Sequence, residues 1–196
     1  MAKAANYTRN SLGLDILSTG AIEKLVGQGI DYLIRNICNP YDKNSFLNAK
    51  NIFLSYYSDH LLDNTKSIKG IPDVLETLKH YPMAVVTNKL ASFAEKILIN
   101  LKLRDYFMAV IARDGTLRRK PYPDPLLLAI KRLNATTKNA VMIGDSRFDI
   151  EAGRLAGVKT IGVSWGFGSP EELMNAKPDA IVHIPEELLT LLLTEQ

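Results

Sequence analysis

With 196 residues, 46% of them apolar, the chain is long enough for one large or two small domains with a hydrophobic core, which excludes a disordered protein. Its 24 basic and 21 acidic residues are scattered and leave a net charge of +3, so we expect no nucleic-acid partner. One cysteine, Cys38, excludes internal disulfides and multi-cysteine metal sites, and we find no apolar leader or membrane-length run, so we expect a cytoplasmic protein without a membrane partner.

Residues 1 to about 66 have helical periodicity and no convincing strand, which predicts a small helical bundle. Gly13 is expected to end a short first helix. A second helix, capped by Ser18 or Thr19, is expected to run until Pro40, and a third to begin near Asn44. The apolar stripe of the second helix consists of Ile22, Leu25, Val26, Ile30, Leu33 and Ile37. The inner side of the third consists of Phe46, Ala49, Phe53, Tyr56, Tyr57 and Leu61.

Two glycines, Gly27 and Gly29, lie inside this predicted second helix. A glycine in a helix interior costs about 1 kcal/mol relative to alanine, so we expect a local reason for both. Close packing of the helix is one explanation, and contact with a substrate is the other.

From Gly70 onward, short apolar runs alternate with helical patterns, which predicts a Rossmann-like three-layer α/β fold with a parallel sheet covered on both faces. Pro72 begins the first helix, which extends to about His80. Strands are expected near 83–87, 107–111, 141–143, 160–163 and 180–182, and further helices near 91–101, 124–133, 147–156 and 186–193. We therefore divide the chain into domains 1–66 and 67–196.

Asp145 and Asp149 follow an apolar run, Val141 to Ile143, that reads as a strand buried on both faces. Open α/β sheets bind ligands at the carboxyl ends of their strands, and an acid four residues later projects to the same side. Oxygen ligands gathered there suit Mg²⁺. The alternative is that both acids only complement the dipole at the start of the next helix.

Two other predicted strands end in loops suited to a ligand. Thr87-Asn88-Lys89 offers a hydroxyl and backbone N–H groups ahead of a helix, which is an anion site or an ordinary helix cap. Gly166-Phe167-Gly168 lets the backbone approach a ligand or forms a plain turn.

Lys120 lies in a segment stiffened by three prolines, where it can neutralise a phosphate and hold a nucleophilic carboxylate in place. The alternative is a solvated surface lysine. The neighbouring Arg118 and Arg119 read as surface charge.

In this order, these segments resemble the motifs of the haloacid dehalogenase superfamily, and within it the phosphoglycolate phosphatase group with a helical cap. The resemblance covers nearly the whole chain and implies that 1–66 is the cap and 67–196 the core. Its segments are Val85-Val86-Thr87-Asn88-Lys89 for the second motif, Lys120-Pro121 for the third, Gly144-Asp145-Ser146-Arg147-Phe148-Asp149 for the fourth, Val26-Gly27-Gln28-Gly29 for the cap, and Gly70-Ile71-Pro72 for the return to the core.

This resemblance implies a Mg²⁺-dependent phosphatase. Asp145 would bind Mg²⁺, Asp149 would support the metal and Lys120, and Thr87 with the amide of Asn88 would hold the phosphoryl oxygens. In the family's chemistry an aspartate attacks a phosphate monoester, and water hydrolyses the aspartyl-phosphate. A second acid protonates the leaving group.

Both reacting acids belong to a first motif, Asp-x-Asp-x-Thr, at the end of a central strand that the 196 residues do not contain. Asp15 is a poor substitute, because no strand precedes it and no acid follows at the second position. Either the sequence begins downstream of the true start, which we favour, or the protein has lost catalysis. In both cases we expect a gap in the sheet and negligible phosphatase turnover by residues 1–196.

The expected partner is a small phosphorylated metabolite, most like phosphoglycolate, and the oligomeric state is not predicted. A pyrophosphatase, a sugar-phosphate phosphatase or a mutase would use the same core, and a non-catalytic phosphate- or metal-binding protein is the alternative outside enzymes. Lys24, Arg35 and Tyr56 are candidate cap contacts to substrate or ordinary surface and packing residues.

Overall fold

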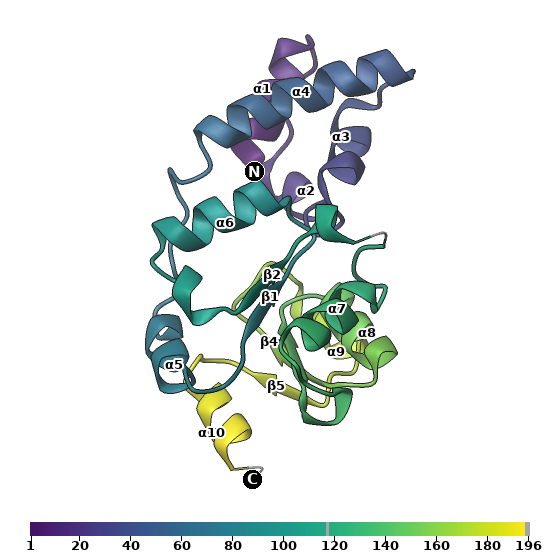
Figure 1. The fold of residues 1–196 in the computed structure, drawn as a ribbon. Coiled ribbons are helices and arrows are strands. Elements are labelled where there is room, and N and C mark those ends of the chain that lie inside the picture. Colours follow the sequence, from purple (N-terminus) through teal and green to yellow (C-terminus); the bar gives the residue numbers. More distant parts are fainter. Residues whose placement is uncertain (117, 195–196) are drawn as a thin grey trace. The chain divides into compact units, whose positions relative to one another are not determined.

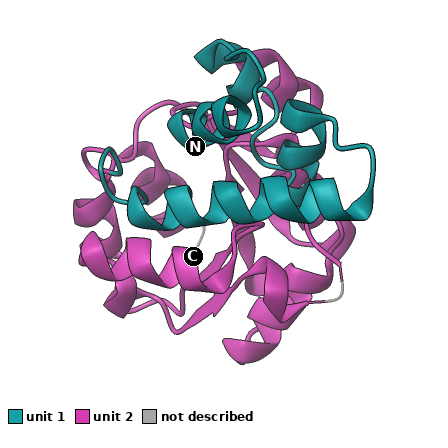
Figure 2. Ribbon diagram, turned by 90° about the horizontal axis from the view of Figure 1, so that it is seen from above, with its two compact units in different colours: residues 1–65 teal, residues 66–196 magenta. Residues whose placement is uncertain are grey.

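The computed structural model describes residues 1–116 and 118–194. The chain divides into two compact units, Met1–Thr65 and Lys66–Gln196 (Figures 1 and 2). The predicted boundary, between residues 66 and 67, lies one residue from this division. Within the described part of the chain, no helix is long and apolar enough to cross a membrane.

The first unit consists of helices α1 (Ala2–Ser11), α2 (Thr19–Glu23), α3 (Ile30–Cys38) and α4 (Lys43–Asp59). Helix α4 begins with a capping box in which the Asp42 carboxylate accepts from the Ser45 N–H at 2.7 Å. Helices α1 and α3 both pack against α4. The core of the first unit includes the fully buried side chains of Ile22, Leu33, Ile34, Ile37 and Phe53.

The single helix predicted from Ser18 to Pro40 is wrong, because the chain forms two helices there. Ser18 caps α2 as expected, but α2 ends at Glu23 and α3 begins at Ile30. Gly27 and Gly29 have φ angles of 106° and 84°, a region that an α-helix of L-residues cannot use. The backbone conformation at these two glycines therefore interrupts the helix between α2 and α3.

The second unit alternates strands and helices as predicted. Its strands are β1 (Ala84–Val86), β2 (Ala109–Ile111), β3 (Val141–Gly144), β4 (Lys159–Val163) and β5 (Ala180–Val182). Its helices are α5 (Ile71–Thr77), α6 (Ala91–Asn100), α7 (Asp124–Arg132), α8 (Arg147–Ala156), α9 (Pro170–Asn175) and α10 (Glu187–Leu193), with short 3-10 turns at Arg104–Tyr106, Arg113–Gly115 and Thr137–Asn139. Only α9 among these α-helices was not predicted.

All described strand pairs are parallel, and they form two sheets, β1-β2 and β3-β4-β5. Among the described residues, β1 pairs only with β2, and β3 only with β4, so each has one edge without a strand partner. A strand that pairs on both sides, as the resemblance implies for the family's first strand, would join two such edges.

This division corrects the prediction that the run at 141–143 is buried on both faces. Val141 is 37% exposed and only Met142 of β3 is buried, while all three residues of β1 are half-buried. A strand that has a neighbour on one side only leaves more of its side chains accessible than a strand that has neighbours on both sides. In β4, which has neighbours on both sides, the four residues from Thr160 to Val163 are buried.

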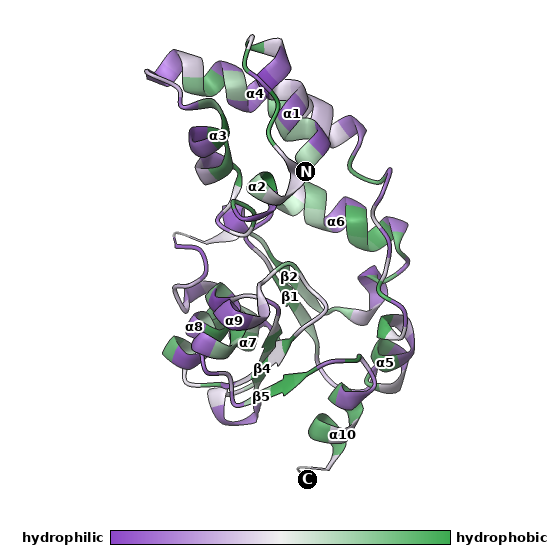
Figure 3. Cartoon of the chain, turned by 180° about the vertical axis from the view of Figure 1, so that it is seen from behind, coloured by the Kyte–Doolittle hydropathy of each residue, from purple (hydrophilic) through white to green (hydrophobic). Residues whose placement is uncertain are grey.

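Helices cover both faces of the strands, so the predicted three-layer α/β class is confirmed. On one face, α5 and α10 bury Val74, Leu78 and Leu188 against β4 and β5. On the other, α7 and α8 bury Leu126 and Ala152 against Met142 of β3, with Val86 of β1 packed beside them. Figure 3 shows β1, β2 and β5 as hydrophobic segments within this core.

Candidate functional site

The ammonium group of Lys120 connects the carboxyl end of β1 to the first turn of α8. Its Nζ donates to the carbonyl oxygen of Val86, the last residue of β1, at 2.6 Å, and to Oδ1 of Asp149 in α8 at 2.5 Å. The side chains of Lys120 and Asp149 are 9% and 7% exposed, so this is a buried ion pair. Further hydrogen bonds offset the cost of burying the pair, from Ser146 to Asp149 and from Lys120 to the Val86 carbonyl. Lys120 is therefore not the solvated surface lysine that the sequence left open.

The side chain of Asn88 fixes the main chain of Lys120 from the loop after β1. Its Oδ1 accepts from the Lys120 N–H, and its Nδ2 donates to the Lys120 carbonyl, both at 3.1 Å. Two hydrogen bonds to one residue define both the position and the direction of the Lys120 backbone. The sequence predicted a phosphate contact through the amide of Asn88, and the structure adds this positioning role.

Asp149 is held through both of its carboxylate oxygens. Oδ1 accepts from Lys120, while Oδ2 accepts from the N–H and the Oγ–H of Ser146 at 3.1 and 2.6 Å, closing a capping box at the start of α8. A Cβ at Gly144 would overlap the Asp149 side chain, so the glycine makes room for it. Asp149 is thus placed to orient Lys120.

Asp145 is half-buried and points to a different partner. Its Oδ2 accepts from the backbone N–H of Phe167, in the loop after β4, at 2.7 Å. Within residues 1–116 and 118–194, Oδ1 makes no hydrogen bond. The same part of the chain contains no group of three or more histidine, cysteine or acidic side chains that could hold a metal. The predicted metal pair therefore supplies one open carboxylate oxygen, on Asp145.

Thr87 sits at the carboxyl end of β1 and extends its pairing. Its N–H donates to the Ile111 carbonyl at 2.9 Å, and its Oγ1 accepts from the Lys89 N–H at 3.1 Å, which leaves the hydroxyl hydrogen to donate. At the start of α6, the Ala91 N–H already donates to the Asp114 carboxylate at 3.0 Å, so this backbone group is not open to an anion. The sequence left an anion site and an ordinary helix cap open for the Thr87-Asn88-Lys89 segment, and its phosphate role stays a prediction.

The remaining candidates have partners within their own unit, or are exposed or half-buried there. Arg118 pairs with Asp124 at 3.1 Å on the surface, as predicted for surface charge. In the first unit, Lys24 and Asp15 are exposed. Arg35 lies over the Phe46 ring, Tyr56 stacks between Tyr7 and His60, and Cys38 is half-buried, with burial raising the pKa of its thiol.

Several contacts of the site could not be read from the sequence. Each of these contacts joins groups that are 22 to 34 residues apart in the sequence. The groups are the Val86 carbonyl, the Asn88 side chain, the Phe167 N–H and the Asp114 carboxylate. The two glycines around Phe167 were a usable signal for a close backbone approach. We expected the loop to approach a ligand or to form a plain turn, whereas in the structure it contacts Asp145.

Comparison with known proteins gives consistent matches. The family described as haloacid dehalogenase-like hydrolase matches residues 1–163. A phosphoglycolate phosphatase of Neisseria meningitidis is 36% identical over 197 residues, covering 95% of this chain and 84% of the relative. One of Nitrosococcus oceani is 31% identical over 188 residues, covering 92% and 84%. The crystal structure of a predicted phosphoglycolate phosphatase from Haemophilus somnus has the same fold, with a TM-score of 0.92 at 24% identity, covering 97% of this chain and 89% of the other.

Proposed function

Because the chain belongs to the haloacid dehalogenase-like hydrolase family, we propose that its site binds a small phosphate monoester for Mg²⁺-dependent hydrolysis, with phosphoglycolate as the first candidate. Two relatives at 31% and 36% identity carry the name phosphoglycolate phosphatase, and both are covered over 84% of their length. The names support the substrate class, and the site geometry supports the binding of an anion.

The observation that carries this proposal is the buried ammonium group of Lys120. An ammonium has three protons, and two of them are donated to the Val86 carbonyl and to Asp149. The third is available for a phosphate oxygen, and the Thr87 hydroxyl is a second donor at the carboxyl end of β1. A fixed cation with little access to water stabilises charge on a phosphoryl group more strongly than a solvated one does.

The residues present fit a Mg²⁺ ion in part. Mg²⁺ in phosphate-processing sites is held by one or two carboxylates together with phosphate oxygens and waters, so the open Oδ1 of Asp145 is a suitable protein ligand. A bound Mg²⁺ would neutralise charge on the phosphate oxygens. Asp149 does not fit as a direct ligand while Lys120 and Ser146 hold its two oxygens. It contributes through Lys120.

The nucleophile of the proposed aspartyl-phosphate route is not supplied by the site residues. The 196-residue sequence contains no Asp-x-Asp pair, and Asp149, the buried acid of the site, has both oxygens engaged. We therefore expect the 1–196 polypeptide to bind Mg²⁺ and phosphoglycolate with negligible turnover. This same observation favours a second function, a non-catalytic phosphate-binding protein.

The test combines binding and turnover on purified 1–196 protein. Isothermal titration with phosphoglycolate and Mg²⁺ should give binding that Lys120→Met and Asp145→Asn weaken, while Arg118→Met, at an exposed ion pair, leaves it unchanged. Phosphate release should stay at background. Hydrolysis that Asp145→Asn abolishes would show that the chain supplies its own nucleophile. Absence of binding by the wild-type protein would refute the proposed site.

A further inference from the structure

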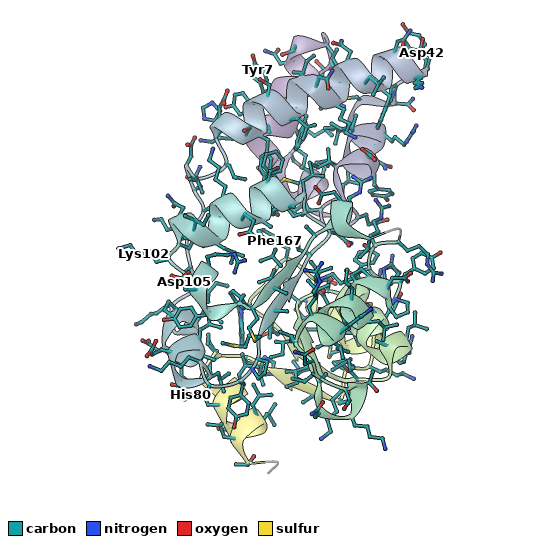
Figure 4. The ribbon with its side chains drawn as sticks, in the orientation of Figure 1. Tyr7, Asp42, His80, Lys102, Asp105 and Phe167 are labelled. Atoms are coloured by element: carbon teal, nitrogen blue, oxygen red, sulfur yellow. The ribbon has the colours of Figure 1, made fainter. Side chains whose placement is uncertain are left out.

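The loop between β4 and α9 holds the carboxylate of Asp145. Oδ2 of Asp145 accepts from the Phe167 N–H at 2.7 Å, across 22 residues of sequence. The Phe167 ring is 78% exposed (labelled in Figure 4), so the backbone of this residue makes the contact and its side chain does not pack in the core. The hydrogen bond fixes one of the two oxygens and leaves the other open.

The glycines on both sides of Phe167 are required by the close fit of this loop. A Cβ at Gly166 would overlap the Asp145 side chain, and a Cβ at Gly168 would overlap the Asp145 carbonyl oxygen. Neither glycine has a φ angle in the left-handed region, so backbone conformation is not the reason for them. The loop therefore touches both the side chain and the main chain of Asp145.

Both ends of the loop are anchored to regular structure. At its start, the Ser164 N–H donates to the Val182 carbonyl of β5 at 3.1 Å. At its end, the Ser169 hydroxyl caps α9 by accepting from the Glu172 N–H at 3.0 Å. Glu172 also pairs with Arg147 of α8 at 2.8 Å, which joins α9 to the helix that begins after Asp145. A loop held in this way can fix the orientation of a carboxylate.

We propose that residues 165–168 are a positioning clamp for Asp145: the Phe167 N–H and the two flanking glycines orient its carboxylate so that Oδ1 faces a divalent cation. This inference rests on the proposed function for the identity of the ligand. Hydrogen-bond partners that orient a metal-binding side chain commonly change metal affinity by about 10- to 100-fold when they are removed. Phe167 is thus a positioning residue, and it acts through its backbone.

Two substitutions at one position separate the backbone from the side chain. Phe167→Pro removes the N–H donor, whereas Phe167→Ala keeps it and removes only the exposed ring. With Mn²⁺ as the probe, followed by electron paramagnetic resonance, Phe167→Pro should bind about 10- to 100-fold more weakly than wild type, and Phe167→Ala should bind like wild type. Equal affinities of the two variants would overturn the proposal.

A second variant covers the case in which Phe167→Pro does not fold. Gly168→Ala keeps the N–H but adds a Cβ that overlaps the Asp145 carbonyl, so it should also weaken Mn²⁺ binding. Gly115→Ala is the matched control, because a Cβ there meets nothing within 4 Å. Wild-type affinity in Gly168→Ala would contradict the clamp.

Hydrogen exchange at the Phe167 amide tests the clamp without any metal. In wild type this amide should exchange slowly, and Asp145→Ala should speed its exchange by about 10-fold or more because the acceptor is lost. Equal exchange rates would refute the clamp. Slow exchange in a wild-type protein that binds Mn²⁺ no better than Asp145→Asn would instead refute the metal assignment of the proposed function, so the two failures are distinguishable.

Discussion

Removing one partner of the buried Lys120–Asp149 pair should destabilise the second unit strongly. Lys120→Met keeps the length of the side chain but leaves a carboxylate that is 7% exposed without its cation, and Asp149→Asn leaves an ammonium that is 9% exposed without its anion. Breaking a buried pair in this way costs about 3–5 kcal/mol. The Ser146 donors still reach the carboxylate, so we expect the lower end of that range.

The control is the exposed pair between Arg118 and Asp124, whose side chains are 57% and 29% exposed. Arg118→Met should change the free energy of unfolding by less than about 1 kcal/mol, because water screens this pair. The double variant Lys120→Met/Asp149→Asn should lose about 1–3 kcal/mol less than the sum of its two single variants, because the second substitution removes a charge that the first left unpaired.

Urea unfolding followed by tryptophan fluorescence measures the free energy of unfolding of the second unit. The sequence has one tryptophan, Trp165, which is half-buried against the core of the second unit. With a slope of about 2 kcal/mol per molar urea, a loss of about 3 kcal/mol lowers the midpoint by about 1.5 M. Strictly additive variants, or a Lys120→Met midpoint equal to that of Arg118→Met, would refute the view of Lys120 as a buried, paired cation.

Two further predictions concern a glycine and a titrating carboxylate of the second unit. Gly144→Ala should lower the free energy of unfolding by about 1–3 kcal/mol, because its Cβ overlaps the Asp149 side chain, whereas Gly115→Ala should leave the urea midpoint almost unchanged. Hydrogen bonds from the Thr160 hydroxyl and N–H, at 2.8 and 2.7 Å, lower the pKa of Asp179. Because the pKa of Asp179 is lower in the folded state, its ionised carboxylate stabilises the fold at any pH above the unfolded-state pKa of about 3.9. This stabilisation is lost as the pH falls through the folded-state pKa. The urea midpoint of wild type should therefore exceed that of Asp179→Asn at pH 7 and approach it below about pH 4; a difference independent of pH would contradict this.

The sequence predicted the order of the elements in the second unit because each strand is a short apolar run between helical patterns. All five strands and the helices α5, α6, α7, α8 and α10 lie where these patterns place them. Helix α9 was missed although Ser169 and Pro170 are a usual helix start, with Ser169 capping it. The helix from Ser18 to Pro40 was predicted as one because its apolar spacing continues across Gly27 and Gly29, while the two positive φ angles break it.

For the site, the sequence identified the residues better than their contacts. Lys120 and Asp149 were expected to act together, and the ion pair between them is present. Their binding and catalytic roles, like those of Thr87, Asn88 and Asp145, stay predictions. The sequence placed Asp145 and Asp149 in one metal pair, but in the structure each carboxylate has its own partner, Phe167 for one and Lys120 with Ser146 for the other.

The sequence by itself determined the local elements, the parallel α/β class, the family and the set of polar residues at the strand ends, because these depend on spacings within a few residues. Only the tertiary structure decided that, among the described residues, β1 pairs with β2 while β3, β4 and β5 form a separate sheet. It also decided that Lys120 connects the end of β1 to the first turn of α8, and that a loop backbone holds Asp145. Those outcomes depend on which groups meet across 22 to 34 residues and how they satisfy buried charges and hydrogen bonds, and no local pattern encodes that choice.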